Sequence, residues 1–355
     1  MTQTTVLFFC FWRVAFGVAF PFWGQYNQTN DEQTRGMQMK GNGNHFIYFL
    51  QRLPIPVCGL TLGLGAVSNL LVGYSGLLHW LYFAVTAALW LLLVCKLVLC
   101  WPQAKQEFAN PLTLSVFEAF FMTLLQMAAA LEPYFHTAAF GMWIAANVGH
   151  IMIVIVFSWR FLRNFQLAAV FTTWNVLYGG NMVAAVLSPM FHVEQLGQII
   201  FWVGFVLFLP WYPISAYRYW KLPVAEAAQP TLCILAAPFN LMLAAYLSCM
   251  PQPDLGMVLL IAVIAQVMYG YVLLRLPGIL RLPFYPSYGA LTFPFVIPAV
   301  AMQKLLTYLT AAGVSYPAFL QYVVLLEQAI AVVMVTYVLV RYVCYLARVY
   351  QTQSN

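Results

Sequence analysis

The stretch LPIPVCGLTLGLGAVSNLLVGYSGLLHWLYFAVTAALWLLLVCKLVLC, residues 53–100, decides the fold class of this chain. It contains two apolar runs, at about 55–75 and 77–100, and its single charged residue is Lys96. A helix that crosses a bilayer needs about 20 mostly apolar residues, and each run is long enough. The first run contains proline and several glycines, whereas Leu77–Leu99 contains neither. The stretch therefore predicts a membrane-embedded helical hairpin with one interrupted helix and one smooth helix.

The rest of the 355-residue chain has the same composition. Hydrophobic residues make up 63% and charged residues 7%, with 15 Lys+Arg and 9 Asp+Glu. A soluble domain carries about 25% charged residues, so a soluble enzyme, a disordered chain and a secreted disulfide scaffold are excluded. Long continuous apolar runs favour helices over the alternating strands of a barrel. The net charge of +6 is spread thinly and predicts no nucleic-acid partner.

Patterns that would support covalent chemistry are missing from the sequence. The seven cysteines form no Cys-x-x-Cys pair, and no two of the five histidines are spaced three or four residues apart. No phosphate-binding glycine loop or Ser/His/Asp arrangement is present. We therefore expect no metal, no cofactor and no enzymatic activity.

The hydrophobic pattern predicts an all-α integral membrane protein with ten transmembrane helices that form five hairpins. Prolines open the first, third, seventh and ninth helices, which indicates a repeat of about 58 residues. The predicted spans are 55–75, 77–100, 111–131, 139–162, 169–188, 195–219, 230–250, 255–275, 287–310 and 318–347.

The distribution of basic residues predicts the orientation. If Leu53 is placed at the cytoplasmic side, thirteen Lys and Arg residues fall on that side and only Lys304 falls in the outer half. Loops rich in Lys and Arg stay in the cytoplasm. We therefore expect a multi-pass protein of the cell membrane whose two termini are cytoplasmic.

Three regions are predicted along the chain. Residues 1–50 form an N-terminal extension, 51–348 form the membrane domain and 349–355 form a short cytoplasmic tail. Within the extension, an apolar run at 6–23 resembles a signal peptide or a short extra span. The polar stretch 24–44 favours disorder, and Met37 or Met39 is an alternative start.

The two helices of each hairpin differ in kind. The odd-numbered spans contain helix breakers, such as Gly59, the pair Gly179-Gly180, Pro238 and Pro294, whereas most even-numbered spans are smoother. Backbone groups freed by a break need protein neighbours or a water-filled cavity when they lie inside a membrane. The pattern therefore predicts an inner ring of five kinked helices around a central pore, with the other five helices outside.

Four of the interrupted helices carry motifs that occur in a fixed order. They are LPIPVCGLTLGL at 53–64, NP at 110–111 with FFMT at 120–123, PTL at 230–232 with AAPF at 236–239, and LTFP at 291–294 with AVA at 299–301. Over about residues 53–347 the chain resembles the tellurite-resistance/dicarboxylate transporter family, which includes bacterial TehA and the plant slow-type anion channels. Asn110 stands where the family usually has His, and the fifth helix lacks the usual proline.

The resemblance implies a homotrimer in which each subunit has its own narrow, largely uncharged pore for small anions. It also implies a gate, because a phenylalanine plugs the pore of the family and Phe293 is the matching residue. Pro294 bends a helix, and such a bend can push the preceding ring into a pore and block it. The alternative for Phe293 is an aromatic ring packed between helices.

Small or helix-breaking residues near these breaks are candidates for the pore wall. Gly59 and Gly63 share one helix face, where they either pack helices closely or leave room for an ion. The candidate lining residues are Gly59, Gly63, Gly179, Gly180, Pro238, Thr292 and Pro294.

Three charged residues lie inside predicted spans, where charges are often functional. Glu118 lies about 10 Å into the third span; the alternatives are a protonated or helix-bonded carboxyl and a role in proton coupling. Lys304 and Glu327 lie at similar depths on consecutive antiparallel helices, which predicts a structural ion pair. Lys304 can also extend toward the membrane surface.

These observations favour an anion channel or channel-like transporter, with small inorganic or organic anions and the lipid bilayer as partners. The alternative is a proton-coupled transporter or exporter of tellurite, sulfite or C4-dicarboxylates on the same fold. A polytopic membrane enzyme and a non-transporting scaffold are weaker alternatives.

Overall fold

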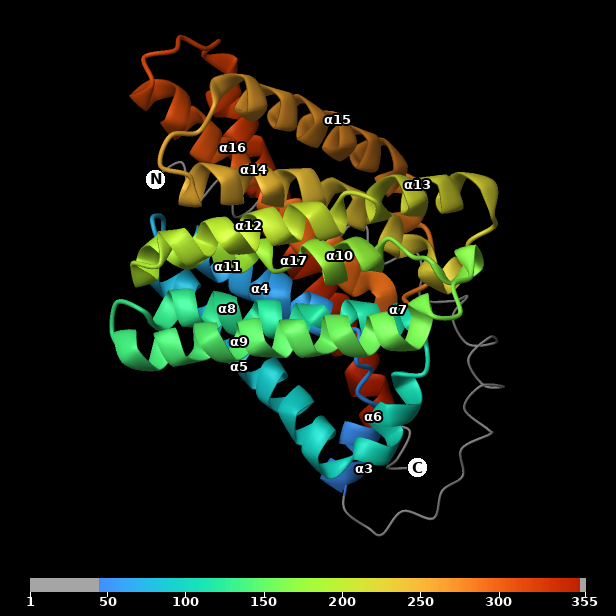
Figure 1. The fold of residues 1–355 in the computed structure, drawn as a ribbon. Helices are drawn as coiled ribbons and strands as arrows, with labels where there is room; N and C mark the ends of the chain where they lie inside the picture. The colour runs from blue at the N-terminus through green and yellow to red at the C-terminus, as the bar shows by residue number, and fades with distance from the viewer. Residues whose placement is uncertain (1–44, 352–355) are drawn as a thin grey trace.

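The computed structural model describes residues 45–351, and every regular element in this range is helical (Figure 1). The predicted apolar run at 6–23, the polar stretch and both candidate start methionines lie outside the described residues. In chain order the helices are α3 His45–Arg52, α4 Val57–Leu70, α5 Gly76–Leu99, α6 Trp101–Glu107, α7 Pro111–Val116, α8 Glu118–Leu131, α9 His136–Phe157, η1 Ser158–Leu162, η2 Leu167–Ala169, α10 Thr173–Gly179, α11 Met182–Leu187, η3 Ser188–Phe191, α12 Glu194–Phe208, α13 Trp211–Lys221, η4 Glu226–Ala236, α14 Ala237–Cys249, α15 Leu255–Leu280, η5 Pro286–Leu291, α16 Phe293–Ala311 and α17 Phe319–Gln351.

Within the described residues, eight helical stretches are long and apolar enough to cross a membrane, and a ninth is the bent pair α3 and α4. This confirms the prediction of an all-α, multi-pass membrane protein. The predicted fifth span, 169–188, is divided among short helices, because α10 ends at Gly179 and only Gly180 and Asn181 separate it from α11. The count of ten spans in five hairpins therefore stays a prediction.

Burial separates the spans into two kinds. In the apolar windows of Pro111–Leu131, Glu226–Cys249 and Pro286–Ala311, 78–83% of residues are buried, against 17–39% in the other five long spans. Helix α4 belongs to the first kind, because every residue from Val57 to Ser68 is buried. The apolar residues of the second kind remain exposed, as expected for surfaces that face lipid.

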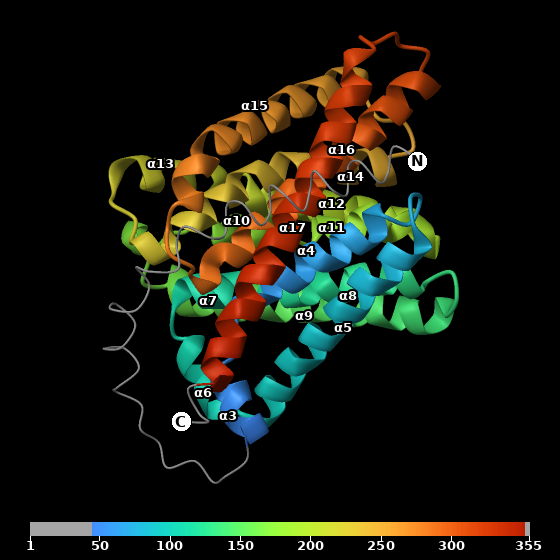
Figure 2. The same cartoon turned by 180° about the vertical axis from the view of Figure 1, so that it is seen from behind.

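The buried helices contact one another in a closed circuit: α4 contacts α8, α8 contacts α11, α11 contacts α14, α14 contacts α16, and α16 contacts α4. The exposed helices pack on the outside of this circuit (Figures 1 and 2). For example, α9 packs on α8, α15 packs on α14, and α17 packs on both α16 and α4.

Several buried segments are not one continuous α-helix. Phe117 separates α7 from α8. The 3₁₀-helix η4 leads directly into α14, and the 3₁₀-helix η5 precedes α16. Pro238 and Pro294 lie in the first turns of α14 and α16. Proline is well tolerated at that position because its missing N–H is not needed. Pro294 therefore does not lie in the middle of an α-helix, as was predicted, because η5 ends at Leu291 and α16 begins at Phe293.

An internal salt bridge fixes the start of the membrane domain. Helix α3 meets α4 at 88°, and α3 lies beside α5 and α6 at one end of the bundle (Figure 2). Lys96 of α5 is fully buried, forms an ion pair with Glu107 and donates to the Leu53 carbonyl at 2.5 Å. The predicted domain boundary at residue 51 falls inside α3, because Leu50 is already part of the buried core. At the other end, α17 continues to Gln351 and so into the predicted tail.

Candidate functional site

A small cavity of about 40 Å³ lies among five buried segments of the chain. The segments are α4, α7 with α8, α10 with α11, η4 with α14, and η5 with α16. Every segment contributes to its wall. The lining residues are Gly59 and Leu62; Val116, Ala119 and Met122; Asn175, Val176, Gly179 and Gly180; Ile234, Ala237, Pro238 and Leu241; and Gly289, Ala290, Phe293 and Pro294.

The wall of this cavity carries no charged side chain among the described residues, and Asn175 is its one polar side chain. The amide nitrogen of Asn175 donates to the hydroxyl of Ser215 at 2.9 Å, which fixes the side chain against α13. No side chain caps the first turns of α14 and α16, which begin at the cavity.

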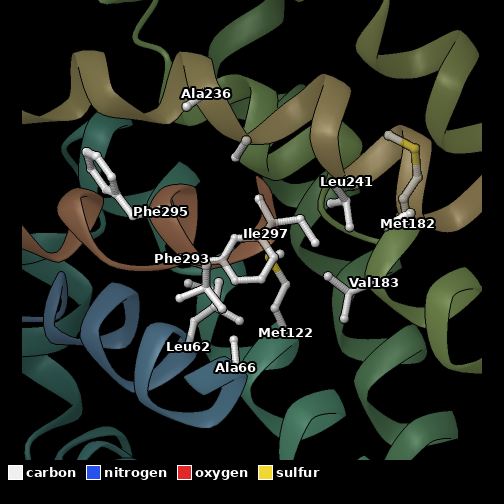
Figure 3. Close-up of a cluster of buried hydrophobic side chains, with 14 of the residues drawn as sticks. Leu62, Ala66, Met122, Met182, Val183, Ala236, Leu241, Phe293, Phe295 and Ile297 are labelled. Atoms are coloured by element: carbon white, nitrogen blue, oxygen red, sulfur yellow. The ribbon is translucent and has the colours of Figure 1, made fainter. Parts of the chain in front are cut away.

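A much wider vestibule of about 1140 Å³ lies beyond Phe293 and Leu241, the two residues that line both spaces. The vestibule is at the end of the bundle that contains the turn between α8 and α9, because Pro133 and Tyr134 line it. The Phe293 side chain is only 6% exposed. Its ring lies among Leu62, Met122 and Ile297, whereas Phe295 projects from another side of the same helix (Figure 3). Phe293 and Leu241 therefore both lie at the border between the small cavity and the vestibule.

The local sequence explains this position. The 3₁₀-helix η5 ends at Leu291, Thr292 follows it, and Phe293 is the first residue of α16. Eleven residues make about three turns of an α-helix, so Phe293 and Lys304 share one helix face with Ile297 and Val300. All four line the vestibule.

The structure brings together six of the eight residues predicted for the gate and the pore wall. Five of them, Gly59, Gly179, Gly180, Pro238 and Pro294, line the small cavity with Phe293.

Gly63 and Thr292 do not line the cavity, because they pack against each other. A Cβ on Gly63 would lie 2.3 Å from Cβ of Thr292, and the hydroxyl of Thr292 donates to the Gly59 carbonyl at 2.7 Å. Of the two explanations considered for Gly63, close helix packing is the one that the geometry supports.

Sequence analysis missed several wall residues that have large apolar side chains. Leu62 follows Gly59 by three residues, and Leu241 follows Pro238 by three. Residues three or four apart share a helix face, so this spacing could have identified both once the glycine and proline were chosen. Asn175 precedes Gly179 by four residues on α10, so the same spacing could have identified it.

Glu118 lies directly behind the cavity wall. Its side chain is 1% exposed, and its Oε1 lies 2.7 Å from Nδ1 of His150 on α9. The other carboxyl oxygen has no hydrogen-bond partner in the described part of the chain. A Cβ added to Gly180 would lie 3.3 Å from Cγ of Glu118, so this buried pair contacts the wall at Gly180. Sequence analysis found Glu118 and missed His150.

Lys304 and Glu327 do not form the expected ion pair in the structure. Lys304 is half-buried and faces the vestibule, whereas Glu327 is 2% exposed and lies near Gln266 and Tyr269 of α15. Their helices are neighbours, but the two side chains leave those helices in different directions. Within residues 45–351 an ion pair joins Lys96 to Glu107, and contacts between a carboxyl and an imidazole join Glu132 to His136 and Glu118 to His150.

Comparison with known proteins gives one positive result. Residues 52–343 match a protein-family model described as a voltage-dependent anion channel. No curated protein matches the chain. The family match covers most of the chain, including all five buried segments and the cavity between them.

Proposed function

The chain belongs to the voltage-dependent anion channel family, and on that basis we propose that it conducts small anions through the vestibule and the small cavity, with Phe293 as the gate between them. The observation that carries this proposal is the position of the Phe293 ring, which borders both spaces. An ion that moves from one space to the other must pass this side chain.

The proposed pathway is an axial one. The closed circuit of contacts among α4, α8, α11, α14 and α16 supports an inner ring of five helices, and the break of the fifth segment at Gly179 and Gly180 accounts for its short helices. We propose ten membrane passages in five hairpins, with both termini in the cytoplasm, and a homotrimer in which each subunit has its own pathway.

Selectivity follows from the chemistry of the small cavity. A space of about 40 Å³ is too small for an ion with a complete hydration shell, and its wall supplies few polar groups in place of water. Transferring a charge into such surroundings is costly unless new partners replace its water. We therefore expect weakly hydrated monovalent anions, such as nitrate and chloride, to pass more readily than sulfate or C4-dicarboxylates.

Anion flux from liposomes tests the proposal. Liposomes that contain the wild-type protein or the Phe293→Ala variant are loaded with chloride, nitrate or sulfate, and efflux is measured after the membrane potential is clamped. We expect the variant to release nitrate and chloride faster than sulfate and to release no potassium. Potassium efflux equal to the chloride efflux, or no anion efflux from correctly inserted protein, would contradict the proposal.

A second candidate is proton-coupled transport on the same scaffold, and the buried pair of Glu118 and His150 favours it. A carboxyl and an imidazole 2.7 Å apart can hold or exchange a proton. The pair also contacts the cavity wall at Gly180, where its protonation state could affect a passing anion.

A proton gradient separates the two candidates. Under coupling, a pH gradient alone drives anion accumulation, and Glu118→Gln abolishes this effect. Glu327→Gln is the matched control, because Glu327 is also a buried carboxyl within a membrane-spanning helix but lies near Gln266 and Tyr269, which line neither cavity. If flux follows only the anion gradient in all three proteins, the channel is supported and coupling is excluded.

A further inference from the structure

The wide vestibule contains one cation that the gate mechanism does not use. Lys304 lies three helical turns from Phe293 on the same face of α16, and both residues line the vestibule. The lining includes Asn69, Gln126 and Gln303, but within the described residues it has no Asp or Glu and no other Lys or Arg. The vestibule therefore presents one positive charge, on the helix that also carries the proposed gate.

No protein group neutralises this charge in the described part of the chain. Lys304 forms no ion pair there. Glu327, on the neighbouring helix α17, lies near Tyr269 of α15 instead. Charges that are partly removed from water are normally paired. A half-buried ammonium without a counter-ion therefore favours an anion from solution.

We propose that Lys304 is an anion-capture site in the vestibule, at which a small monovalent anion binds before it reaches Phe293. This inference rests on the proposed function for its physiological role. The ammonium holds the anion within about 4 Å, and the neutral lining leaves the attraction uncancelled. A single lysine binds weakly enough for the anion to leave, which conduction requires.

The position of Lys304 also predicts an asymmetry. Lys304 is about 16 Å from Phe293 along α16, at ~1.5 Å per residue, and it lies on the vestibule side of the gate only. It concentrates anions that enter from the vestibule and does little for those that enter from the opposite end. Chloride current at low salt should therefore be larger in the first direction.

Conductance measurements in the open Phe293→Ala background test the proposal. Lys304→Gln should lower chloride conductance from the vestibule side about fivefold at 10 mM salt. The difference should nearly vanish at 1 M salt, where the screening length is about 3 Å. Lys304→Arg should leave the chloride conductance unchanged. Lys221→Gln should also have no effect on the conductance, because Lys221 lines neither the small cavity nor the vestibule.

A lysine that only anchors the helix at the membrane surface gives the opposite result, because Lys304→Gln then leaves the low-salt conductance and its asymmetry unchanged. That result would overturn the proposal. Anomalous scattering from crystals soaked in bromide provides an independent measurement that needs no conduction. We expect a bromide peak at the Lys304 ammonium that is absent in Lys304→Gln; no peak in the wild-type protein would also overturn the capture site.

Discussion

Replacing Phe293 by alanine removes the ring that separates the two spaces, and the expected effect on current can be estimated from its burial. Truncating a buried phenylalanine costs about 3–5 kcal/mol, which is an upper estimate of the contact energy that holds the ring in place. We take the lower value because the ring borders empty space on two sides. With a factor of ten for each ~1.4 kcal/mol, the closed state is favoured about 100-fold. Phe293→Ala should raise chloride current by about that factor.

Phe295→Ala is the matched control for this experiment. Phe295 is on the same helix and is fully buried, but it lines neither space and its ring lies 6.1 Å from that of Tyr269. Its truncation should lower stability by about 3–5 kcal/mol and leave the current at the wild-type level. Currents are measured in planar bilayers with equal amounts of inserted protein. The reasoning is refuted if Phe293→Ala raises current less than threefold, or if Phe295→Ala raises it equally.

Three further substitutions test packing and charge. Gly63→Ala should lower the free energy of unfolding by about 1–3 kcal/mol, because the new methyl group meets Thr292. Gly141→Ala is the control: its methyl group meets nothing within 4 Å, and the variant should be neutral or stabilising in thermal unfolding. Lys96→Met should cost about 2–4 kcal/mol in the same assay, because it removes a buried ammonium that binds backbone carbonyls; an unchanged melting temperature would contradict this assignment. Glu118→Gln should leave channel-type chloride flux within about threefold of wild type, since neutralising a carboxylate behind the wall changes the field at the cavity only modestly; complete loss of chloride flux, with insertion intact, would show that the carboxylate itself is required.

The membrane fold was predictable because its signals are local in sequence. Apolar runs near 20 residues identify spans, and glycine or proline identifies breaks, as at Gly179 and Pro238. The exact consequence of a break was less predictable. Pro294 was expected in the middle of a helix, but it lies in the first turn of α16, because the preceding residues adopt a 3₁₀-helix that ends at Leu291. Both outcomes satisfy the geometry of proline, and the sequence alone does not distinguish them.

Contacts between helices were predictable only where depth could be counted. Glu118 and His150 lie roughly equal numbers of residues before and after the turn between α8 and α9. Counting residues from the turn, as was done for Lys304 and Glu327, would therefore have paired Glu118 with His150. For the second pair the count predicted a similar depth, but the two side chains do not pair. Depth does not give the direction in which a side chain leaves its helix, and at Lys304 that direction leads to the vestibule.

The reversal potential of the current through Phe293→Ala tests the central claim most directly. With a tenfold gradient of potassium chloride across the bilayer, an anion-selective pathway reverses near the chloride equilibrium potential, about 59 mV from zero. We predict a value close to this limit and of the sign set by chloride. Reversal near zero would indicate an unselective opening, and reversal at the opposite sign would indicate a cation pathway; either result would contradict the proposed function.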